Sequence, residues 1–191
     1  MPAKRELTYA GYLHLDALLA LQHRVAPPTL GPQVQAAEHF FIVVHQAFEL
    51  WFKQVLVDLD GAAGALALPD VDGEAALDHL LRVAAILRLL GQHMALFDHL
   101  TPHTFLAFRP YLGSASGSES AQFRAVKRAL GLHQGAQSPV YDAFRAALDH
   151  AGLTLDQLYA QPGRHGTLYR LAEALVDIAM GFWQVEAMHV Q

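Results

Sequence analysis

The stretch from Phe40 to Asp60, FFIVVHQAFELWFKQVLVDLD, decides the fold of this chain. Its apolar residues recur every three or four positions, as they do on the buried face of an amphipathic helix of about six turns. The pattern therefore predicts a long, largely buried helix. These apolar positions are Phe41, Val44, Phe48, Trp51 or Phe52, Val55 and Leu59.

His45 lies within this apolar face, one turn after Phe41 and one turn before Glu49. A neutral imidazole among aromatic groups can accept or pass a proton near neutral pH, which favours a functional role. The alternative is a core histidine whose ring is satisfied by a backbone partner, because most buried polar groups are simply hydrogen-bonded. Spacing alone leaves both interpretations open.

The composition indicates one sizeable domain, residues 1–191, with a substantial core. Hydrophobic residues make up 53% of the 191 and charged residues only 16%, so we expect another subunit to cover some apolar surface. A homo-oligomer is therefore expected. The formal charge of −5 and the lack of a long basic run argue against a nucleic-acid partner.

Neither a membrane anchor nor a secretory leader is expected. No segment has the ~20 uninterrupted apolar residues that cross a bilayer, and the start MPAKRELTYAG lacks an apolar signal core. We therefore expect a soluble, cytoplasmic protein. The chain has no cysteine, which excludes disulfides, a thiol nucleophile and thiolate-ligated haem, and its twelve histidines are the main supply of metal ligands.

The rest of the chain predicts further helices, and no stretch shows the alternation of a strand. The predicted fold class is all-α, a helical bundle. Breakers and caps divide it into expected helices at Tyr9–His23, Gln35–Asp60, Glu74–His99 and Pro102–Pro110, one that ends at Gly131, and others at Pro139–Gly152, Leu153–Tyr159 and Leu168–His189. Either Ser118 or Ser120 would cap the helix that ends at Gly131, and Ser138 would open the one that follows.

A short helix is predicted after Leu100, because Thr101-Pro102 is an N-cap followed by proline at the first helical position. It would direct Phe105 and Phe108 to one side, with Arg109 next to Phe108. A run of small residues, Gly113 to Ser118, follows it. This run is either a flexible linker or a place where glycine lets the backbone approach a ligand.

The last helix has a regular seam that ends in a histidine. Leu168, Leu171, Leu175, Ile178, Phe182 and Val185 recur at intervals of three and four, and His189 takes the next position. This histidine is either a core residue or a metal ligand. No HExxH motif is present, and a single internal histidine suits a haem iron, which needs one protein ligand in a dry slot.

Several short motifs together resemble the tryptophan 2,3-dioxygenase family. They occur in family order from Leu7 to His189: Tyr9-Ala-Gly-Tyr12-Leu13, Phe41 to Gln46 with Glu49-Leu50-Trp51, Leu100-Thr101-Pro102 with Phe108-Arg109, Leu112-Gly113 with Ser116-Gly117, Ser120 with Gln122 and Arg124, and Leu175-Val176-Asp177 with Phe182 and His189. The resemblance implies an all-helical enclosure for haem b, usually in a homotetramer, and a family fold that continues beyond residue 191. The implied reaction is insertion of both atoms of O2 across the indole C2=C3 bond of L-tryptophan, which gives N-formylkynurenine in the kynurenine pathway of tryptophan catabolism.

The resemblance also implies roles for individual residues. His189 would be the axial ligand of the haem iron, and His45 would accept the indole N–H. Arg109 would bind the substrate carboxylate through its planar guanidinium. The remaining expected contacts to the substrate are Phe41, Phe105 and Phe108 around the indole, Tyr9, Tyr12 and Leu13 from a neighbouring subunit, and Ser114, Ser116 and Gly117 in the small-residue loop.

Two other functions stay open on the sequence alone. One is a histidine-ligated haem monooxygenase of the same superfamily that hydroxylates a tryptophan- or tyrosine-like compound in secondary metabolism. The other is a haem-free helical protein that binds a divalent metal or a partner.

Overall fold

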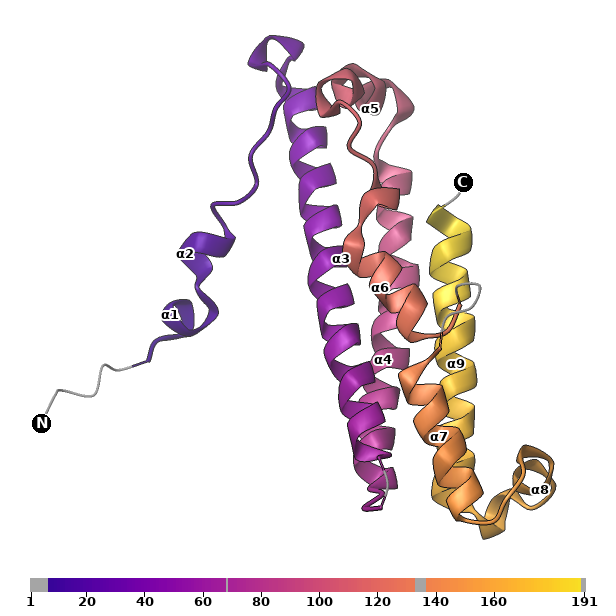
Figure 1. Cartoon of the computed structure of the whole chain (residues 1–191). Coiled ribbons are helices and arrows are strands. Elements are labelled where there is room, and N and C mark those ends of the chain that lie inside the picture. Colours follow the sequence, from indigo (N-terminus) through magenta and orange to yellow (C-terminus); the bar gives the residue numbers. More distant parts are fainter. Residues whose placement is uncertain (1–6, 68, 133–136, 190–191) are drawn as a thin grey trace, which may run out of the picture. The chain divides into compact units, whose positions relative to one another are not determined.

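Every regular element in the part of the chain that the structure describes is a helix. This computed structural model describes residues 7–67, 69–132 and 137–189, apart from the side chains at 118, 188 and 189, and contains no strand among them. The all-α prediction is therefore confirmed for these residues (Figure 1). The α-helices are α1 (Tyr9–Leu13), α2 (Leu15–Leu18), α3 (Pro32–Ala65), α4 (Gly73–Met94), α5 (Pro102–Phe108), α6 (Ala121–Ala129), α7 (Pro139–His150), α8 (Leu155–Ala160) and α9 (Gly166–His189).

Short 3₁₀ turns connect several of these helices. They are η1 (Pro28–Leu30), η2 (Ala95–His99), η3 (Arg109–Leu112), η4 (Gly117–Glu119) and η5 (Pro162–Arg164). The predicted third helix therefore changes to a 3₁₀ turn after Met94, and the predicted short helix after Pro102 changes to one at Arg109.

The prediction of one helix from Tyr9 to His23 is wrong. His14 adopts the left-handed conformation, with φ 51° and ψ 42°, and divides the segment into α1 and α2. Neither helix buries a residue, so the apolar spacing here does not mark a face packed within this chain.

The helix caps that the sequence predicted are present. Thr101 accepts a hydrogen bond from the backbone N–H of Thr104, and Pro102 occupies the first helical position of α5. Ser120 caps α6 and Ser138 caps α7 in the same way, each through its side-chain oxygen. A side-chain oxygen that satisfies an orphan N–H fixes where each helix begins.

The described residues form two compact units. Unit 1 contains residues 1–45 and 100–115, and unit 2 contains residues 46–99 and 116–191. Helix α3 runs through the boundary at His45. The expectation of a single domain stays a prediction.

Unit 2 is built on α4 and α9, which lie side by side (Figure 1). Gly181 of α9 permits the close approach, because a Cβ there would be only 3.1 Å from the Cβ of Leu87. The predicted seam of α9 is buried at Leu171, Ile178, Phe182 and Val185. Close packing along this seam is what holds the two helices together.

The unit 2 part of α3 buries the predicted face. Phe48, Val55 and Leu59 are buried, and the ambiguous position resolves to Phe52, since Trp51 is exposed. Phe52 contacts Phe123 of α6, with ring centroids 5.6 Å apart. Phe123 in turn stacks on Phe182 of α9 at 5.3 Å, so aromatic rings link three helices.

A buried carboxylate also joins α3 to α4. Asp58 is fully buried and accepts hydrogen bonds from His79 Nδ1 at 2.8 Å, Arg82 Nη1 at 3.0 Å and Gln54 Nε2 at 2.8 Å. Gly61 faces the His79 ring so closely that a Cβ there would lie 2.7 Å from the imidazole Cε1. These donors compensate for taking the charge of Asp58 out of water.

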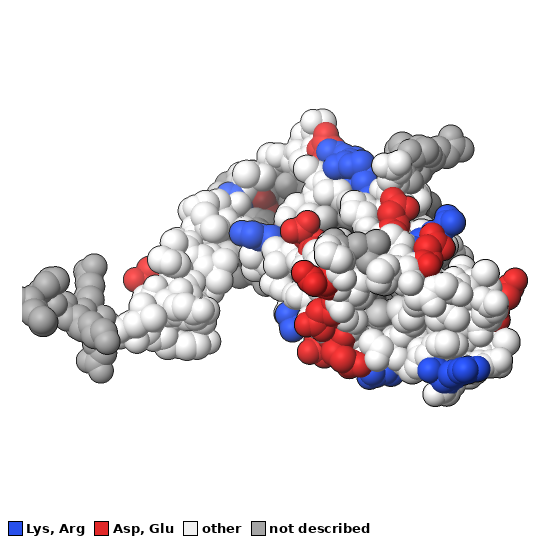
Figure 2. Space-filling view, turned by 60° about the horizontal axis from the view of Figure 1, so that its bottom comes forward, with Lys and Arg blue, Asp and Glu red and all other residues white. Residues whose placement is uncertain are grey.

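Uncharged residues cover most of the face seen in Figure 2, where basic and acidic side chains both occur. Two helical stretches, α3 and Gly73–His99, are long and apolar enough to cross a membrane by length and composition alone. The buried core helices of soluble proteins satisfy the same criterion, so this observation is weak evidence for a membrane location.

Candidate functional site

His45 is tied to the helix that carries it. Its Nδ1 lies 2.8 Å from the carbonyl oxygen of Phe41, one turn earlier in α3. Because a carbonyl oxygen only accepts, Nδ1 of the neutral ring carries the hydrogen and Nε2 presents the lone pair. The interpretation of His45 as a histidine with a backbone partner is therefore consistent with the structure. This partner favours the tautomer in which Nε2 is the acceptor.

Three phenylalanine rings form a cluster beside this histidine. The centroids of Phe41, Phe105 and Phe108 are 5.4 to 5.8 Å apart. The imidazole of His45 lies against Phe41, with centroids 4.0 Å apart and planes inclined by 41°. Phe108 is fully buried, whereas Phe41, Phe105 and His45 are half-buried. The family resemblance implied that these residues share one site, and in unit 1 their rings are in contact.

The start of α5 determines where two of these rings lie. The cap at Thr101 and the proline at position 102 fix the first turn, so Phe105 and Phe108 fall one turn apart on the same face of α5. Their rings meet edge to face at 5.4 Å. Such pairs add about 0.5–1.5 kcal/mol beyond the burial of their area.

Arg109 follows the cluster and holds the turn after α5. Its Nη1 donates to the carbonyl oxygen of Gly113 at 2.8 Å. Gly113 has φ 59° and ψ −130°, a conformation that only glycine adopts without strain. The sequence predicted a carboxylate partner for this guanidinium and did not predict the bond to Gly113. Arginine has five N–H donors, so one bond to a carbonyl is compatible with a bidentate contact to a carboxylate.

The sequence reasoning missed Glu38, which positions one wall of the cluster. Glu38 is fully buried in α3 and accepts the backbone N–H of Val25 at 2.6 Å and that of Ala26 at 3.2 Å. Gln35 Nε2 donates to the carbonyl oxygen of Ala26 at 2.9 Å. Ala26 belongs to the same apolar core as Phe108, so these polar bonds fix a segment that packs on the rings. The start of α3, PQVQAAEH, mixes polar and apolar residues, so no local sequence signal marks Glu38 for this role.

The residues expected to serve a neighbouring subunit are exposed in this chain. The exposed fractions of Tyr9 and Tyr12 are 76% and 66%, and Leu13 is also exposed. Thr8 caps α1, so the segment has a defined local structure without a packed face. Within unit 1 the structure therefore does not bring these three residues to the phenylalanine cluster.

The small-residue loop crosses the boundary between the two units. Ser114 belongs to unit 1, while Ser116 and Gly117 belong to unit 2. The backbone N–H of Ser116 donates to the carboxylate of Glu119 at 3.2 Å, which closes the loop locally. The expected role of these three residues in substrate binding stays a prediction.

His189 is the last residue of α9, and its side chain lies outside the described part of the structure. Its backbone position is one turn after Val185, so it continues the register of the buried seam. Glu186, in the turn before it, forms an ion pair with Lys127 of α6. The assignment of His189 as an axial ligand stays a prediction.

The described residues form an all-helical protein. The imidazole of His45 is hydrogen-bonded to its own helix and lies against a cluster of three phenylalanines, and Arg109 directly follows one of them, Phe108. A sequence profile of the family described as tryptophan 2,3-dioxygenase matches residues 2–154. A curated relative with this name from Kineococcus radiotolerans is 42% identical, over 66% of this chain and 42% of the relative. Another, from Herpetosiphon aurantiacus, is 38% identical, over 82% of this chain and 55% of the relative. A third, from Mayetiola destructor, is 34% identical over 81% of this chain and 40% of the relative.

This chain belongs to the tryptophan 2,3-dioxygenase family, because the family profile covers most of it. The matched part of the chain spans about half or less of the length of these relatives. The profile match includes all candidate residues of unit 1, from Tyr9 to Ser114, and ends before α9 and His189.

Membership of the family implies haem and O2. The residue types of the chain are compatible with a haem iron, since histidine is a common haem ligand and position 189 comes one turn of α9 after the buried Val185. Among the described residues, no group of three or more His, Asp or Glu side chains gathers at one point. A haem iron does not need several protein side chains around it, because the porphyrin supplies four of its ligands.

Proposed function

We propose that this chain contributes to a haem-dependent dioxygenase that inserts both atoms of O2 across the indole C2=C3 bond of L-tryptophan, giving N-formylkynurenine in the kynurenine pathway. The observation that carries the proposal is the 2.8 Å contact of His45 Nδ1 with the carbonyl oxygen of Phe41, from which the tautomer of the ring is inferred. An indole N–H needs an acceptor, and Nε2 becomes that acceptor when Nδ1–H donates to Phe41. Family membership supports the same reaction.

The phenylalanine cluster suits the indole ring in this proposal. Phe41, Phe105 and Phe108 present aromatic faces and edges at 5.4 to 5.8 Å spacing, and a flat bicyclic ring packs well on such surfaces. Arg109 would bind the substrate carboxylate while its bond to Gly113 keeps the guanidinium in place. Ser114, Ser116 and Gly117 would supply further polar contacts from the loop.

His189 would hold haem b, and the bound haem would supply the ferrous iron for O2 chemistry. The chain's own residues orient the indole and exclude water from it. His45 holds the indole N–H at Nε2, and Phe108, fully buried, closes the rear of the cluster against solvent.

The exposed aromatic residues near the N-terminus support an oligomer in this proposal. Helix α1 has no buried residue, and the side chains of Tyr9, Tyr12 and Leu13 are all exposed. Large apolar side chains are rarely exposed together unless a partner covers them. We infer that they enter the substrate site of a neighbouring copy in a homotetramer or dimer. We also propose a soluble, cytoplasmic location for such an enzyme.

The proposal is tested by reconstituting the protein with haem and recording its absorption spectrum. We expect a Soret band that is lost in His189→Ala and kept in His103→Ala, a matched change at an exposed histidine of α5. His45→Ala should keep the band and lower turnover of L-tryptophan by about 10²-fold, as expected for loss of a positioned proton acceptor. If His189→Ala binds haem as the wild type does, the ligand assignment is wrong.

Product analysis with ¹⁸O₂ separates the remaining functions. Two labelled atoms in N-formylkynurenine support the dioxygenase, whereas one labelled atom in a hydroxylated product identifies the monooxygenase. A protein that shows no Soret band after reconstitution, and whose activity is lost with a chelator, identifies the haem-free alternative.

A further inference from the structure

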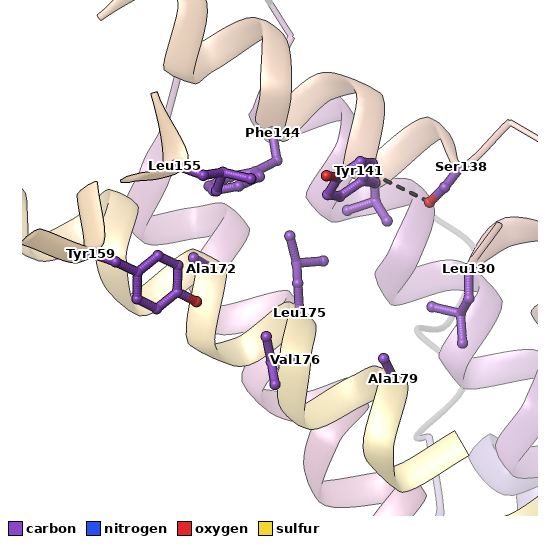
Figure 3. A pocket seen from close by; sticks show the side chains of 11 residues that line it. Leu130, Ser138, Tyr141, Phe144, Leu155, Tyr159, Ala172, Leu175, Val176 and Ala179 are labelled. Atoms are coloured by element: carbon purple, nitrogen blue, oxygen red, sulfur yellow. Dashed lines mark hydrogen bonds between the residues drawn. The ribbon is translucent and has the colours of Figure 1, made fainter. Parts of the chain in front are cut away.

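Unit 2 contains a cavity between α7, α8 and α9 that has no part in the function proposed above. Its volume is about 330 Å³ (Figure 3). Tyr141 and Tyr159, on opposite sides of it, are 42% and 44% exposed, so the cavity is open to solvent between them. A space of this size lies at the lower end of the range for small-molecule sites.

Among the described residues that line this cavity, none is charged and none is a histidine. Its polar groups are hydroxyls, and its aromatic groups are Tyr141, Phe144 and Tyr159. Ser138 Oγ donates to the carbonyl oxygen of Ala129 at 2.7 Å and accepts from the backbone N–H of Tyr141 at 3.4 Å. A hydroxyl oxygen has two lone pairs, so Ser138 retains the capacity to accept one further hydrogen bond.

Tyr159 forms a fixed wall of the cavity. Its hydroxyl donates to Glu173 Oε1 at 2.9 Å, and its ring meets that of Tyr169 edge to face at 5.5 Å. Burial raises the pKa of the Tyr159 phenol above its ordinary value, and the hydrogen bond to Glu173 adds to the effect. The phenol therefore stays neutral at physiological pH, and the wall carries no charge.

Small residues of α9 create the space. Ala172, Val176 and Ala179 recur at helical spacing on the face toward the cavity, and Figure 3 shows them along α9 opposite Tyr141 and Phe144 of α7. A charged group or an amino-acid zwitterion in such a lining would lose its hydration without gaining a partner. A neutral ring would instead exchange water for apolar and aromatic contacts.

We propose that this cavity binds a small uncharged molecule with one substituted aromatic ring, of the phenol class, whose hydroxyl donates to Ser138 Oγ. The proposal stands independently of the function proposed for the His45 site. The ring would lie between the aromatic side chains of α7 and α8 and the small residues of α9.

Calorimetric titration of the protein with 4-methylphenol tests the proposal. We expect saturable binding of one molecule per chain, and no binding of 4-methylbenzoate, which has the same ring and a carboxylate, at the same concentrations. Val176→Trp should fill the cavity and weaken binding at least about tenfold. Val57→Trp is the matched control, because it makes the same change at an exposed valine of α3 outside the cavity and should bind as the wild type does.

Ala179→Phe repeats the filling at a second exposed position, in case the first variant folds poorly. His45→Ala should leave binding unchanged, since the cavity shares no residue with that site. The proposal is overturned if the wild type gives no saturable binding, if both filled variants bind as the wild type does, or if 4-methylbenzoate binds as well as 4-methylphenol.

Discussion

Gly61 and Gly64 lie in the same helix but should respond in opposite ways to alanine. At Gly61 a Cβ would lie 2.7 Å and 2.8 Å from Cε1 and Nε2 of His79, closer than non-bonded atoms approach. At Gly64 nothing lies within 4 Å of the added atom. The pair therefore separates the effect of the contact from the general effect of replacing a helical glycine.

The size of the change in the free energy of unfolding follows from the hydrogen bond between His79 and Asp58. Gly61→Ala displaces the imidazole and breaks its 2.8 Å bond to the buried carboxylate of Asp58, and a hydrogen bond to a charged group is worth about 1.5–3 kcal/mol. The gain in helix propensity, about 1 kcal/mol, offsets part of this loss. We expect the free energy of unfolding to fall by about 0.5–2 kcal/mol for Gly61→Ala. For Gly64→Ala, near the end of α3, it should rise by up to about 1 kcal/mol.

Urea unfolding followed by circular dichroism at 222 nm measures both variants. Repeating Gly61→Ala in a His79→Ala background completes a double-mutant cycle, in which the penalty should disappear and the alanine should become stabilising. The reasoning is refuted if Gly61→Ala stabilises the otherwise unchanged protein as much as Gly64→Ala does.

Three further substitutions test the contacts of both units. Glu38→Gln should destabilise unit 1 by about 1.5–3 kcal/mol and speed hydrogen exchange at Val25 and Ala26, because Glu38 accepts hydrogen bonds from their backbone N–H groups. The control, Glu74→Gln at an exposed site, should change stability by less than about 0.5 kcal/mol. Phe108→Ala should cost about 3–5 kcal/mol in urea unfolding, since the ring is fully buried, and equal stability of this variant and the exposed Leu106→Ala would contradict the cluster. Ser138→Ala should lower the free energy of unfolding by about 1–2 kcal/mol through loss of the cap on α7, and the thermal midpoint should fall with it; an unchanged midpoint would show that the cap is dispensable.

Local signals in the sequence predicted the helices well. The caps at Thr101, Ser120 and Ser138 were found because capping depends on residues three positions apart. The buried seam of α9 was found because its period matches the helix. Periodicity could not distinguish Phe52 from the exposed Trp51, since adjacent residues differ by only 100° around the helix.

The features that the sequence did not predict include two buried carboxylates with distant partners. Glu38 accepts N–H groups 12 and 13 residues away, and the partners of Asp58 on α4 lie 21 and 24 residues away, so no local pattern marks either carboxylate as buried. The break at His14 depends on one left-handed residue that apolar spacing does not register. For the candidate site, the family resemblance grouped His45 with the three phenylalanines, and the structure shows contacts among these rings, while their roles stay a prediction. The bond from Arg109 to Gly113 was not predicted.

The tether on His45 comes from a main-chain oxygen, not from a side chain. Exchange of the residue at position 41 for another helix-forming residue would therefore alter the packing against the imidazole and leave its proton on Nδ1. During evolution the neighbouring wall can change in shape and size while the acceptor nitrogen stays the same. The shape of the wall beside His45 and the position of the proton on its ring can therefore change independently of each other.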